Sequence, residues 1–240
     1  MWKNVGMPTP RERARERTLA EIRSLAWLQV EEVGPAALSL RGIARDLGVV
    51  SSAIYRYVSS RDDLLTELLV AGFSDLAEAV ERAESVVPRE AYRERWLTIC
   101  RTMRAWALGR PAAWGLLYGG PVPGYNAPQQ TTAVPGARVL LQQGAVLIEA
   151  QAAGRLRPRI GPAGDLGEVP AVLRAELEAA AAAFQLEVGA ELVALGILGW
   201  TISVAVISSE VFEQLGPDAI AARDQLAELQ FASAADALGL

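Results

Sequence analysis

Residues 39–69 read SLRGIARDLGVVSSAIYRYVSSRDDLLTELL, and the positions of apolar residues and glycine in this stretch decide the fold. Ser39 is a good N-cap for a helix over residues 40–47, because its hydroxyl can accept a hydrogen bond from a free N–H of the first turn. Gly48 is placed to end that helix, and a second short helix is predicted over residues 51–57. Two short helices joined by a glycine-led turn indicate a helix-turn-helix.

The apolar residues of the stretch predict how the two helices pack. They are Leu40, Ile43, Ala44, Leu47, Val49, Ile54 and Val58. At this spacing they can form one apolar wedge between the helices, which leaves the other face of the second helix open to solvent. That outward face carries Ser51, Ser52, Ala53, Tyr55, Arg56 and Tyr57.

The outward face has the chemistry of a DNA-reading surface. Small residues let the end of the helix enter the major groove, where Arg56 can donate two hydrogen bonds to guanine O6 and N7. Tyrosine hydroxyls on the same face, and arginines at the starts of the neighbouring helices, can reach phosphates. For any one of these residues, an ordinary solvated helix position is the more frequent explanation, but together they favour DNA binding. The predicted DNA-binding residues are Ser39, Arg41, Ser51, Ser52, Ala53, Tyr55, Arg56, Tyr57 and Arg61.

This stretch resembles the N-terminal pattern of the TetR family of bacterial transcriptional regulators, roughly Leu-Thr-x-x-x-Ile-Ala-x-x-x-Gly-Val-Ser-x-x-x-Leu-Tyr-x-His/Tyr-Phe-x-x-Lys-x-x-Leu. The matching positions are Leu38, Ser39, Ile43, Ala44, Gly48, Val49, Ile54, Tyr55, Tyr57, Val58, Arg61 and Leu64. The largest departure is Val50, because the family usually has a capping Ser there. We therefore expect Ser51 to cap the second helix and to shift its start by one residue.

The resemblance implies an all-α fold in two parts. Residues 1–60 would form a three-helix helix-turn-helix DNA-binding domain with an arm at 1–14, and residues 61–240 a helical ligand-binding and dimerisation domain. It also implies a homodimeric repressor that binds double-stranded operator DNA and is released by a small-molecule effector. The segment WGLLYGGPVPGY (Trp114–Tyr125) and the later Gly199-Trp200, Glu210-Val211-Phe212 and Gly216 look like the subgroup with a WHG-type C-terminal domain.

Helical spacing of apolar residues predicts the elements on either side of this stretch. Helices are expected over residues 11–33, 60–84, 89–109, 111–118, 137–153, 171–186, 191–215 and 217–238. Residues 119–136 hold four glycines and four prolines, which predicts a long loop that is either a flap over a ligand entrance or a disordered connection. A second Gly/Pro-rich interruption spans residues 154–170.

Aromatic side chains recur on the helices of the second part. Rings with few polar partners line cavities for apolar or aromatic ligands, and they also fill ordinary cores, so both alternatives stay open for any one residue. Cys100 lies on an apolar helix face and fits inert packing better than a redox sensor. The candidate pocket residues are Trp96, Cys100, Met103, Trp106, Trp114, Tyr118, Tyr125 and Trp200.

Residues 192–209 form an uncharged run of eighteen residues, near the lower limit for a membrane-spanning helix. Glycine, serine and threonine dilute the run, and no nearby Lys or Arg sets an orientation. A helix buried by its own subunit and by a partner explains the run better than a membrane span. We therefore expect a homodimer through the two long helices at 171–186 and 191–215, and no membrane partner. Small residues at 179–183, Gly196, Gly199 and Ala205 would allow close helix approach.

Charge and composition narrow the class of protein. The chain has a net charge of −5, but residues 1–65 carry ten basic and eight acidic side chains, against 13 and 20 in residues 66–240. DNA binding is thus expected only at the N-terminal end.

There is no histidine and one cysteine, so the usual hydrolase triads and zinc sites are excluded, and we expect neither catalysis nor a cofactor nor a metal. An enzyme and a protein-binding scaffold are the alternatives. No signal peptide pattern begins the chain, and a cytoplasmic location is expected.

Overall fold

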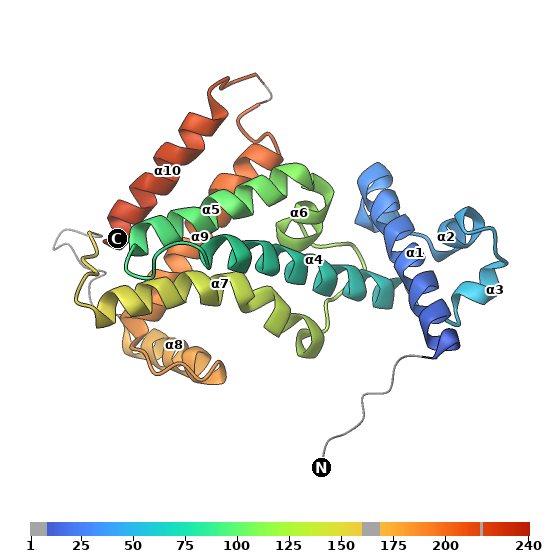
Figure 1. The fold of residues 1–240 in the computed structure, drawn as a ribbon, viewed down its shortest axis with the longest axis horizontal. Coiled ribbons are helices and arrows are strands. Elements are labelled where there is room, and N and C mark those ends of the chain that lie inside the picture. Colours follow the sequence, from blue (N-terminus) through green and yellow to red (C-terminus); the bar gives the residue numbers. More distant parts are fainter. Residues whose placement is uncertain (1–8, 160–168, 217) are drawn as a thin grey trace, which may run out of the picture.

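The computed structural model describes residues 9–159, 169–216 and 218–240, and every regular element in these ranges is a helix (Figure 1). The elements are α1 (Pro10–Val33), the 3₁₀ turn η1 (Pro35–Ala37), α2 (Leu40–Asp46), α3 (Ser51–Ile54), α4 (Arg61–Glu84), α5 (Tyr92–Gly109), α6 (Pro111–Tyr118), α7 (Gln129–Ala152), α8 (Ala171–Ala183), α9 (Ala190–Val211) and α10 (Arg223–Leu238). The predicted all-α class is confirmed. Most of the predicted arm, and part of the predicted interruption at 154–170, lie outside the described residues.

The first three helices pack around a small apolar core. Ile22, Ala26 and Val30 recur every four residues on α1 and are buried against α2 and α3. Five members of the predicted wedge are buried, namely Leu40, Ile43, Ala44, Ile54 and Val58. The prediction is wrong for Val49, which is 44% exposed. The left-handed backbone of Gly48 (φ 70°) turns the chain outward there, and a side chain would strain that conformation.

The second helix of the motif is shorter than predicted, and its cap differs. Val50 occupies the N-cap position without a side-chain hydrogen bond, so Ser51 is the first helical residue and does not cap. The expected one-residue shift is therefore wrong. After Ile54 the chain continues as a 3₁₀-type turn, in which the N–H groups of Arg56 and Tyr57 donate to the carbonyls three residues earlier. The regular helix therefore ends at Ile54.

Helix α4 joins the N-terminal core to the rest of the molecule. Ser60 caps it by accepting a hydrogen bond from Asp63 N (3.0 Å), and Asp62 and Asp63 lie in its first turn, where the helix dipole favours anions. Its first two turns bury leucines in the N-terminal core, and Leu76, Ala77 and Val80 belong to the larger core beyond. Figure 1 shows α4 running from α1–α3 into the helical bundle.

The larger core is formed mainly by α4, α5, α7, α9 and α10. Helix α5 contributes a buried stripe that includes Trp96, Cys100 and Met103. Helix α8 lies against α9, where Leu177 and Ala190 form a small separate cluster. The C-terminal helices thus surround α5, whereas α8 forms an outer layer on α9.

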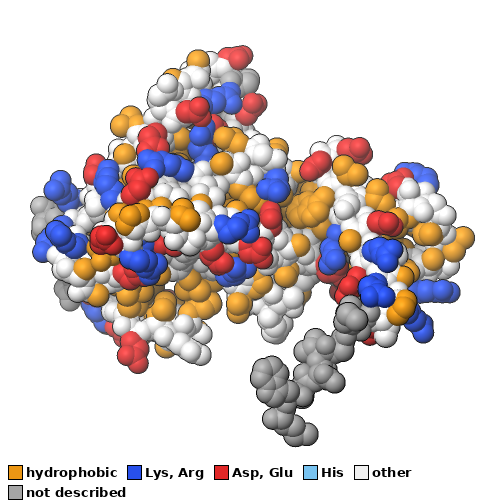
Figure 2. Space-filling view, viewed as in Figure 1, with side chains coloured by type: hydrophobic (Ala, Val, Ile, Leu, Met, Phe, Trp, Pro, Cys, Tyr) orange, Lys and Arg blue, Asp and Glu red, His pale blue; other side chains and the backbone are white. Residues whose placement is uncertain are grey.

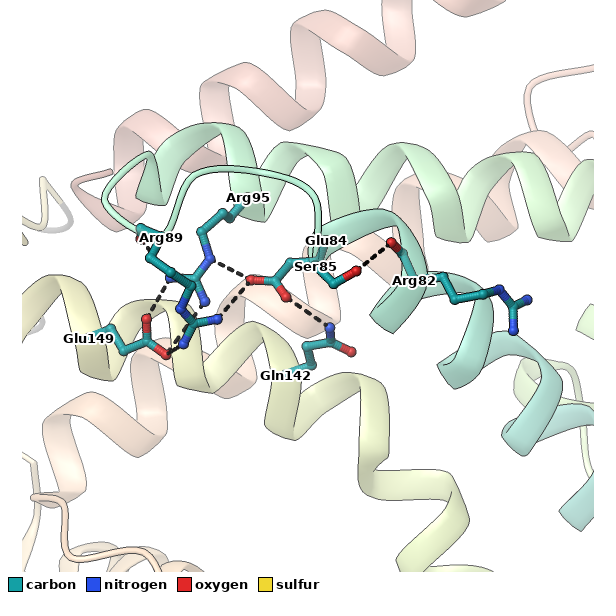
Figure 3. A network of polar contacts seen from close by, with 7 residues as sticks. All are labelled: Arg82, Glu84, Ser85, Arg89, Arg95, Gln142 and Glu149. Atoms are coloured by element: carbon teal, nitrogen blue, oxygen red, sulfur yellow. Dashed lines mark hydrogen bonds and ion pairs between the residues drawn. The ribbon is translucent and has the colours of Figure 1, made fainter.

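Buried charges hold the far end of α4 (Figure 3). Arg95 is 1% exposed, and its guanidinium donates to Glu84 at the end of α4 and to Glu149 on α7 (Nη1–Oε2 2.6 Å). Arg89 pairs with the same two carboxylates. Burial alone would lower the pKa of Arg95, but the hydrogen bonds with Glu149 and Glu84 raise it, so the cation persists in the core.

The loop predicted over residues 119–136 is the largest error in the predicted boundaries. Only its first part is irregular, because α7 begins at Gln129 and carries Pro135 within the helix. The N–H groups of Thr131 and Thr132 bond to the Pro128 carbonyl and form the first turn. A Cβ on Gly136 would lie 3.5 Å from the Phe73 ring of α4, so the backbone packs closely here. Tertiary packing outweighs the local breakers.

Four other boundaries differ by three to six residues. Helix α5 begins at Tyr92 instead of 89, because the chain turns after Pro88. Helix α8 ends at Ala183 instead of 186, and Gln185 just beyond it has a positive φ (59°). Helix α9 ends at Val211 instead of 215, and Glu213 just beyond it has a positive φ (49°). Helix α10 begins at Arg223 instead of 217.

Helix α9 contains the uncharged run. Among the described residues it alone is long and apolar enough to cross a membrane by length and composition, and 33% of that span is buried within this chain. Core helices of proteins in water meet the same criteria, so this is weak evidence for a span. Two of its glycines face the chain's own interior: a Cβ on Gly196 would lie 3.9 Å from Gly144 of α7, and one on Gly199 would lie 3.0 Å from Leu238.

Candidate functional site

The helix-turn-helix displays a set of polar side chains on one outward face. Ser51, Ser52, Tyr55 and Arg56 are exposed, whereas Ile54 between them is buried. The Arg56 side chain takes part in no hydrogen bond or ion pair with the described residues. The turn that follows α3 therefore presents an unpaired guanidinium beside the small residues of α3, which is the arrangement that base reading in the major groove needs.

Three of the predicted DNA-binding residues also have structural partners. Ser39 caps α2 by accepting from Gly42 N (3.3 Å). Arg61 donates from Nη2 to the carbonyls of Pro35 and Ala36, each at 3.0 Å, and so holds η1 onto α4. Tyr57 is half-buried beneath a cation from α1. By contrast, Arg41 is exposed at the start of α2, and Ala53 is half-buried on α3.

A contribution from α1 was not among the predicted site residues. The Arg15 guanidinium carbon lies 5.7 Å from the centre of the Tyr57 ring. Arg11 and Arg15 share the helical stripe of Ile22, which is buried, whereas Arg13 and Arg17 lie on the opposite side of α1. Figure 2 shows Lys and Arg side chains gathered over the part of the molecule that holds α1–α3. The alternating arginines of residues 11–17 were the available sequence signal.

Glu12 caps the start of α1. It closes a capping box with Thr9, in which the Thr9 N–H donates to Glu12 Oε2 (2.6 Å) and the Glu12 N–H donates to the Thr9 hydroxyl (3.2 Å). The hydrogen bond from the Thr9 backbone lowers the pKa of Glu12. The carboxylate is thus held at the positive end of the helix dipole, where an anion is stabilised.

The predicted pocket residues fall into three groups. Trp96, Cys100 and Met103 on α5 are completely buried. Trp114 and Tyr118 of α6 approach Trp200 of α9, with ring centres 4.4 Å apart for Trp114 and Tyr118 and 6.1 Å apart for Tyr118 and Trp200. The other two candidates lie apart. Trp106 donates its indole N–H to Asp75 Oδ2 (2.7 Å), and the Tyr125 hydroxyl lies 2.8 Å from the Thr66 hydroxyl.

Two buried polar residues beside this group were missed. Gln143 of α7 and Ser203 of α9 are 0% exposed, and Gln143 Nε2 donates to Ser203 Oγ (3.0 Å). Cys100 Sγ lies 3.4 Å from the same hydroxyl. Burial raises the pKa of the Cys100 thiol to about 12, which favours inert packing over redox chemistry. A glutamine within an apolar helix face was the only sequence signal for this polar group.

Two cavities border these elements. One of about 370 Å³ lies between α4, α6, the loop after α6 and the start of α7, with Phe73, Leu117 and Tyr125 in its wall. The segment predicted as a flap therefore does line a cavity. Another of about 100 Å³ lies between α7, α8 and α9 and has an apolar wall.

Comparison with known proteins gives consistent matches along the chain. Residues 22–68 match the family model of bacterial regulatory proteins of the tetR family, and residues 96–234 match the tetracyclin repressor-like C-terminal domain. The chain is 42% identical over 208 residues to the HTH-type transcriptional regulators Mb1846 of Mycobacterium bovis and Rv1816 of Mycobacterium tuberculosis, covering 87% of this chain and 86% of each relative. Its fold is similar to that of the regulatory protein SCO4313, with a TM-score of 0.70 and 28% identity over 94% of this chain and 98% of that one.

Proposed function

The chain belongs to the TetR family and is a DNA-binding transcriptional regulator, and on this premise we propose that it is a cytoplasmic homodimeric repressor that a small apolar or aromatic effector releases from its operator. The relatives are regulators, not enzymes. We assign residues 1–60 to DNA binding and 61–240 to effector binding and dimerisation, with a C-terminal part of the WHG type. In this proposal the recognition helices of the two subunits enter successive major grooves, about 34 Å apart or a multiple of it.

The exposed, unpaired Arg56 in the turn after α3 is the observation that carries the DNA-reading proposal. Its neighbours Ile54 and Val58 are buried, so the side-chain alternation fixes which face points away from the core. We assign base contacts to Arg56, Ser51 and Ser52 and phosphate contacts to Tyr55, Tyr57 and Arg41. Ala53 would allow close approach to the groove. Ser39 and Arg61 would act mainly by holding α2 and η1 in place.

We extend the proposed DNA surface to Arg11 and Arg15 of α1. The contact of Arg15 with Tyr57 supports this extension, because it places that stripe of α1 beside the end of α3. Two added cations raise the local positive potential without requiring a basic protein. Each would neutralise one phosphate and release its counterions.

Helices α8 and α9 are the proposed dimer surface. Large apolar side chains remain exposed on them, with exposed fractions of 76% for Val172, 43% for Leu173 and 40% for Ile197. The apolar cavity between α7, α8 and α9 adjoins this face. A partner packed on the same helices by two-fold symmetry would cover these side chains. Gly196 and Gly199 serve packing within the subunit instead, as their contacts with α7 and α10 indicate.

Binding to the chain's own upstream DNA tests the proposed function. We expect a gel shift at low salt, and Arg56→Ala is expected to reduce the preference for that DNA over unrelated DNA. Absence of any shift with a folded dimer would contradict the DNA-binding role.

A matched pair of double variants tests the α1 extension. Arg11→Ala with Arg15→Ala removes four arginines from the proposed dimer and is expected to reduce the slope of log K against log salt by about 3.6, or roughly 0.9 for each phosphate that is no longer neutralised. Arg13→Ala with Arg17→Ala removes the same charge from the opposite face and is expected to change the slope much less. Equal slopes for the two pairs would remove α1 from the proposed surface.

Light scattering tests the dimer surface. Ile197→Asp places a charge within the proposed interface and is expected to yield monomers. The control Val86→Asp changes a side chain that is 83% exposed in the α4–α5 connection and is expected to remain dimeric. A dimeric Ile197→Asp variant would place the interface elsewhere.

A further inference from the structure

One turn of α9 is surrounded by buried polar atoms that have no partner. Among the described residues, five buried side-chain N or O atoms lack a hydrogen-bond partner: Trp96 Nε1, Tyr118 OH, Gln142 Oε1, Gln143 Oε1 and Trp200 Nε1. Four of them, all except the Gln142 atom, belong to side chains on or next to residues 199–203. We call these four the α9 polar cluster.

Contacts from three other helices place the α9 polar cluster. Trp96 Nε1 of α5 lies 3.6 Å from the position of a Cβ on Gly199. Gln143 of α7 uses its Nε2 on Ser203, which leaves its Oε1 unused. The Tyr118 ring of α6 lies edge-on to Trp200. Helices α5, α6 and α7 therefore each bring one unpaired polar group to the same turn of α9.

Unpaired groups of this kind are unusual in a folded core, where nearly all buried polar atoms find a partner. The same domain pairs its other indoles. Trp106 Nε1 donates to Asp75 (2.7 Å), and Trp114 Nε1 donates to Ser208 (3.0 Å). The fold thus satisfies these two tryptophans and leaves unpaired both Trp200 of α9 and Trp96, which lies against the neighbouring Gly199. Such convergence is expected of groups whose partner is a ligand.

We propose that the α9 polar cluster is the effector-binding site and that its ligand is an uncharged cyclic hydroxy-ketone. The indole N–H groups of Trp96 and Trp200 and the Tyr118 hydroxyl would donate to its carbonyl and hydroxyl oxygens, and Gln143 Oε1 would accept from its hydroxyl. Aromatic walls favour a flat ring system. This inference rests on the proposed function, since it names the ligand to which that repressor would respond.

The surrounding charges exclude an ionic ligand. Each nearby cation on α5 is already neutralised: Arg95 by Glu84 and Glu149, Arg101 by Glu94 and Glu228, and Arg104 by Glu210 and Asp224. Burial raises the pKa of Tyr118, so its hydroxyl remains a neutral donor. A carboxylate would lose its hydration here without gaining a cation.

Packing contacts also connect the α9 polar cluster to the DNA-binding helices. The Tyr118 ring meets Phe73 of α4 edge-on, with ring centres 5.8 Å apart. The start of α4 lies in the same apolar core as α1, α2 and α3. A ligand that displaces Tyr118 would therefore press on α4 and change the position of α3.

Three compounds that share a two-ring skeleton test the ligand class. We expect 5-hydroxy-1-tetralone to raise the Tm and to change the tryptophan fluorescence. Tetralin lacks both polar groups and is expected to bind at least tenfold more weakly. The anion 5,6,7,8-tetrahydro-2-naphthoate is expected not to bind. Equal binding of all three, or binding of the anion alone, would overturn the proposed class.

Variants test the site itself. Tyr118→Phe removes only an unpaired hydroxyl, so it should leave the free protein at least as stable as the wild type while weakening the binding of 5-hydroxy-1-tetralone about three- to tenfold. Trp200→Phe should weaken binding by a similar factor, and it also loses indole packing, so its Tm should fall. The control Trp106→Phe loses indole packing and a hydrogen bond to Asp75, so it should lower the Tm further than Trp200→Phe while leaving the affinity for the compound unchanged. If Tyr118→Phe destabilises the free protein and neither Tyr118→Phe nor Trp200→Phe alters compound binding, the groups are structural and the site is wrong.

Operator binding is measured in the same samples without compound. A protein that binds its upstream DNA but fails the compound and variant tests retains the regulator function and loses this site. A protein that binds no DNA but passes the compound and variant tests retains the site as a ligand site and contradicts the proposed function. Binding of 5-hydroxy-1-tetralone without any weakening of operator binding would overturn the assignment of the cluster as the effector site.

Discussion

The two ends of α4 are held in different ways. At its start, leucines pack into the core of the helix-turn-helix, Ser60 caps the helix and Arg61 donates to two carbonyls of η1. At its end, Glu84 is paired with the buried Arg95. Apolar packing has no fixed direction, whereas an ion pair with several hydrogen bonds fixes orientation. Both ends have directional hydrogen bonds, but only the far end has a buried ion pair. We therefore propose that α4 is anchored in the C-terminal helical bundle and that its other end, which carries the DNA-binding helices, is the adjustable one.

The anchored end gives the largest expected effect. Arg95→Met removes the buried cation from Glu84 and leaves it only the more exposed Arg89 at 3.5 Å, and breaking a buried pair costs about 3–5 kcal/mol of the free energy of unfolding. Urea denaturation followed by circular dichroism measures it. Arg82→Met is the control at the same end of α4, because Arg82 pairs with Glu78 at the surface and its loss should cost less than about 1 kcal/mol. If the two variants lose equal free energy of unfolding, the buried ion pair does not anchor the far end of α4.

The turn before α3 gives the next largest effect. Gly48 has φ 70°, and Ala in this left-handed region is expected to cost about 1–2 kcal/mol. Gly48→Ala should therefore lower the Tm and weaken DNA binding together, since the turn orients α3. Gly48→Asn should cost less, because asparagine tolerates this conformation. If Gly48→Ala matches the wild type in both measurements, the turn does not set the orientation of α3.

The cap of α4 is a smaller contribution at the adjustable end. Ser60→Ala removes the acceptor for Asp63 N and should lower stability by about 1 kcal/mol. Ser60→Asp restores an acceptor and should recover most of the loss. Thermal denaturation of the wild type, Ser60→Ala and Ser60→Asp measures these differences. If the Tm of Ser60→Asp is no higher than that of Ser60→Ala, the capping role is contradicted.

A surface ion pair away from α4 should give the smallest effect, and only in acid. The hydrogen bond from Arg101 lowers the pKa of Glu228, which joins α10 to α5. Because the folded-state pKa is depressed, this stabilisation is present above pH 4.5 and is lost as the pH falls through the folded value. Between pH 5 and pH 3 the Tm of the wild type should fall slightly more than that of Glu228→Gln. Parallel curves would show that the pair contributes no stability.

The same contrast explains what the sequence could predict. The helix-turn-helix depends on local signals, such as the spacing of Ile43 and Ile54 and the glycine at 48. Most of its buried residues could therefore be predicted from the sequence alone. The C-terminal helical bundle depends on contacts between distant residues. Neither the continuation of α7 through Pro135 nor the meeting of Gln143 with Ser203 has a local signal. Aromatic residues at helical spacing predicted that Trp96, Tyr118 and Trp200 matter, but only the packing separates their unpaired N–H and O–H groups from the paired indole of Trp106.

The central claim is that a ligand at the α9 polar cluster moves the DNA-binding helices through α4. Distance measurement between spin labels tests it most directly, in the dimer carrying Ser24→Cys, an exposed position on α1 outside the proposed DNA surface. The burial that raises the pKa of Cys100 to about 12 keeps that thiol from reacting with the label. Saturating 5-hydroxy-1-tetralone should shift the label-to-label distance distribution, and the added Tyr118→Phe substitution should abolish most of the shift at the same concentration. An unchanged distribution in a dimer whose Tm shows that the compound is bound would contradict the claim.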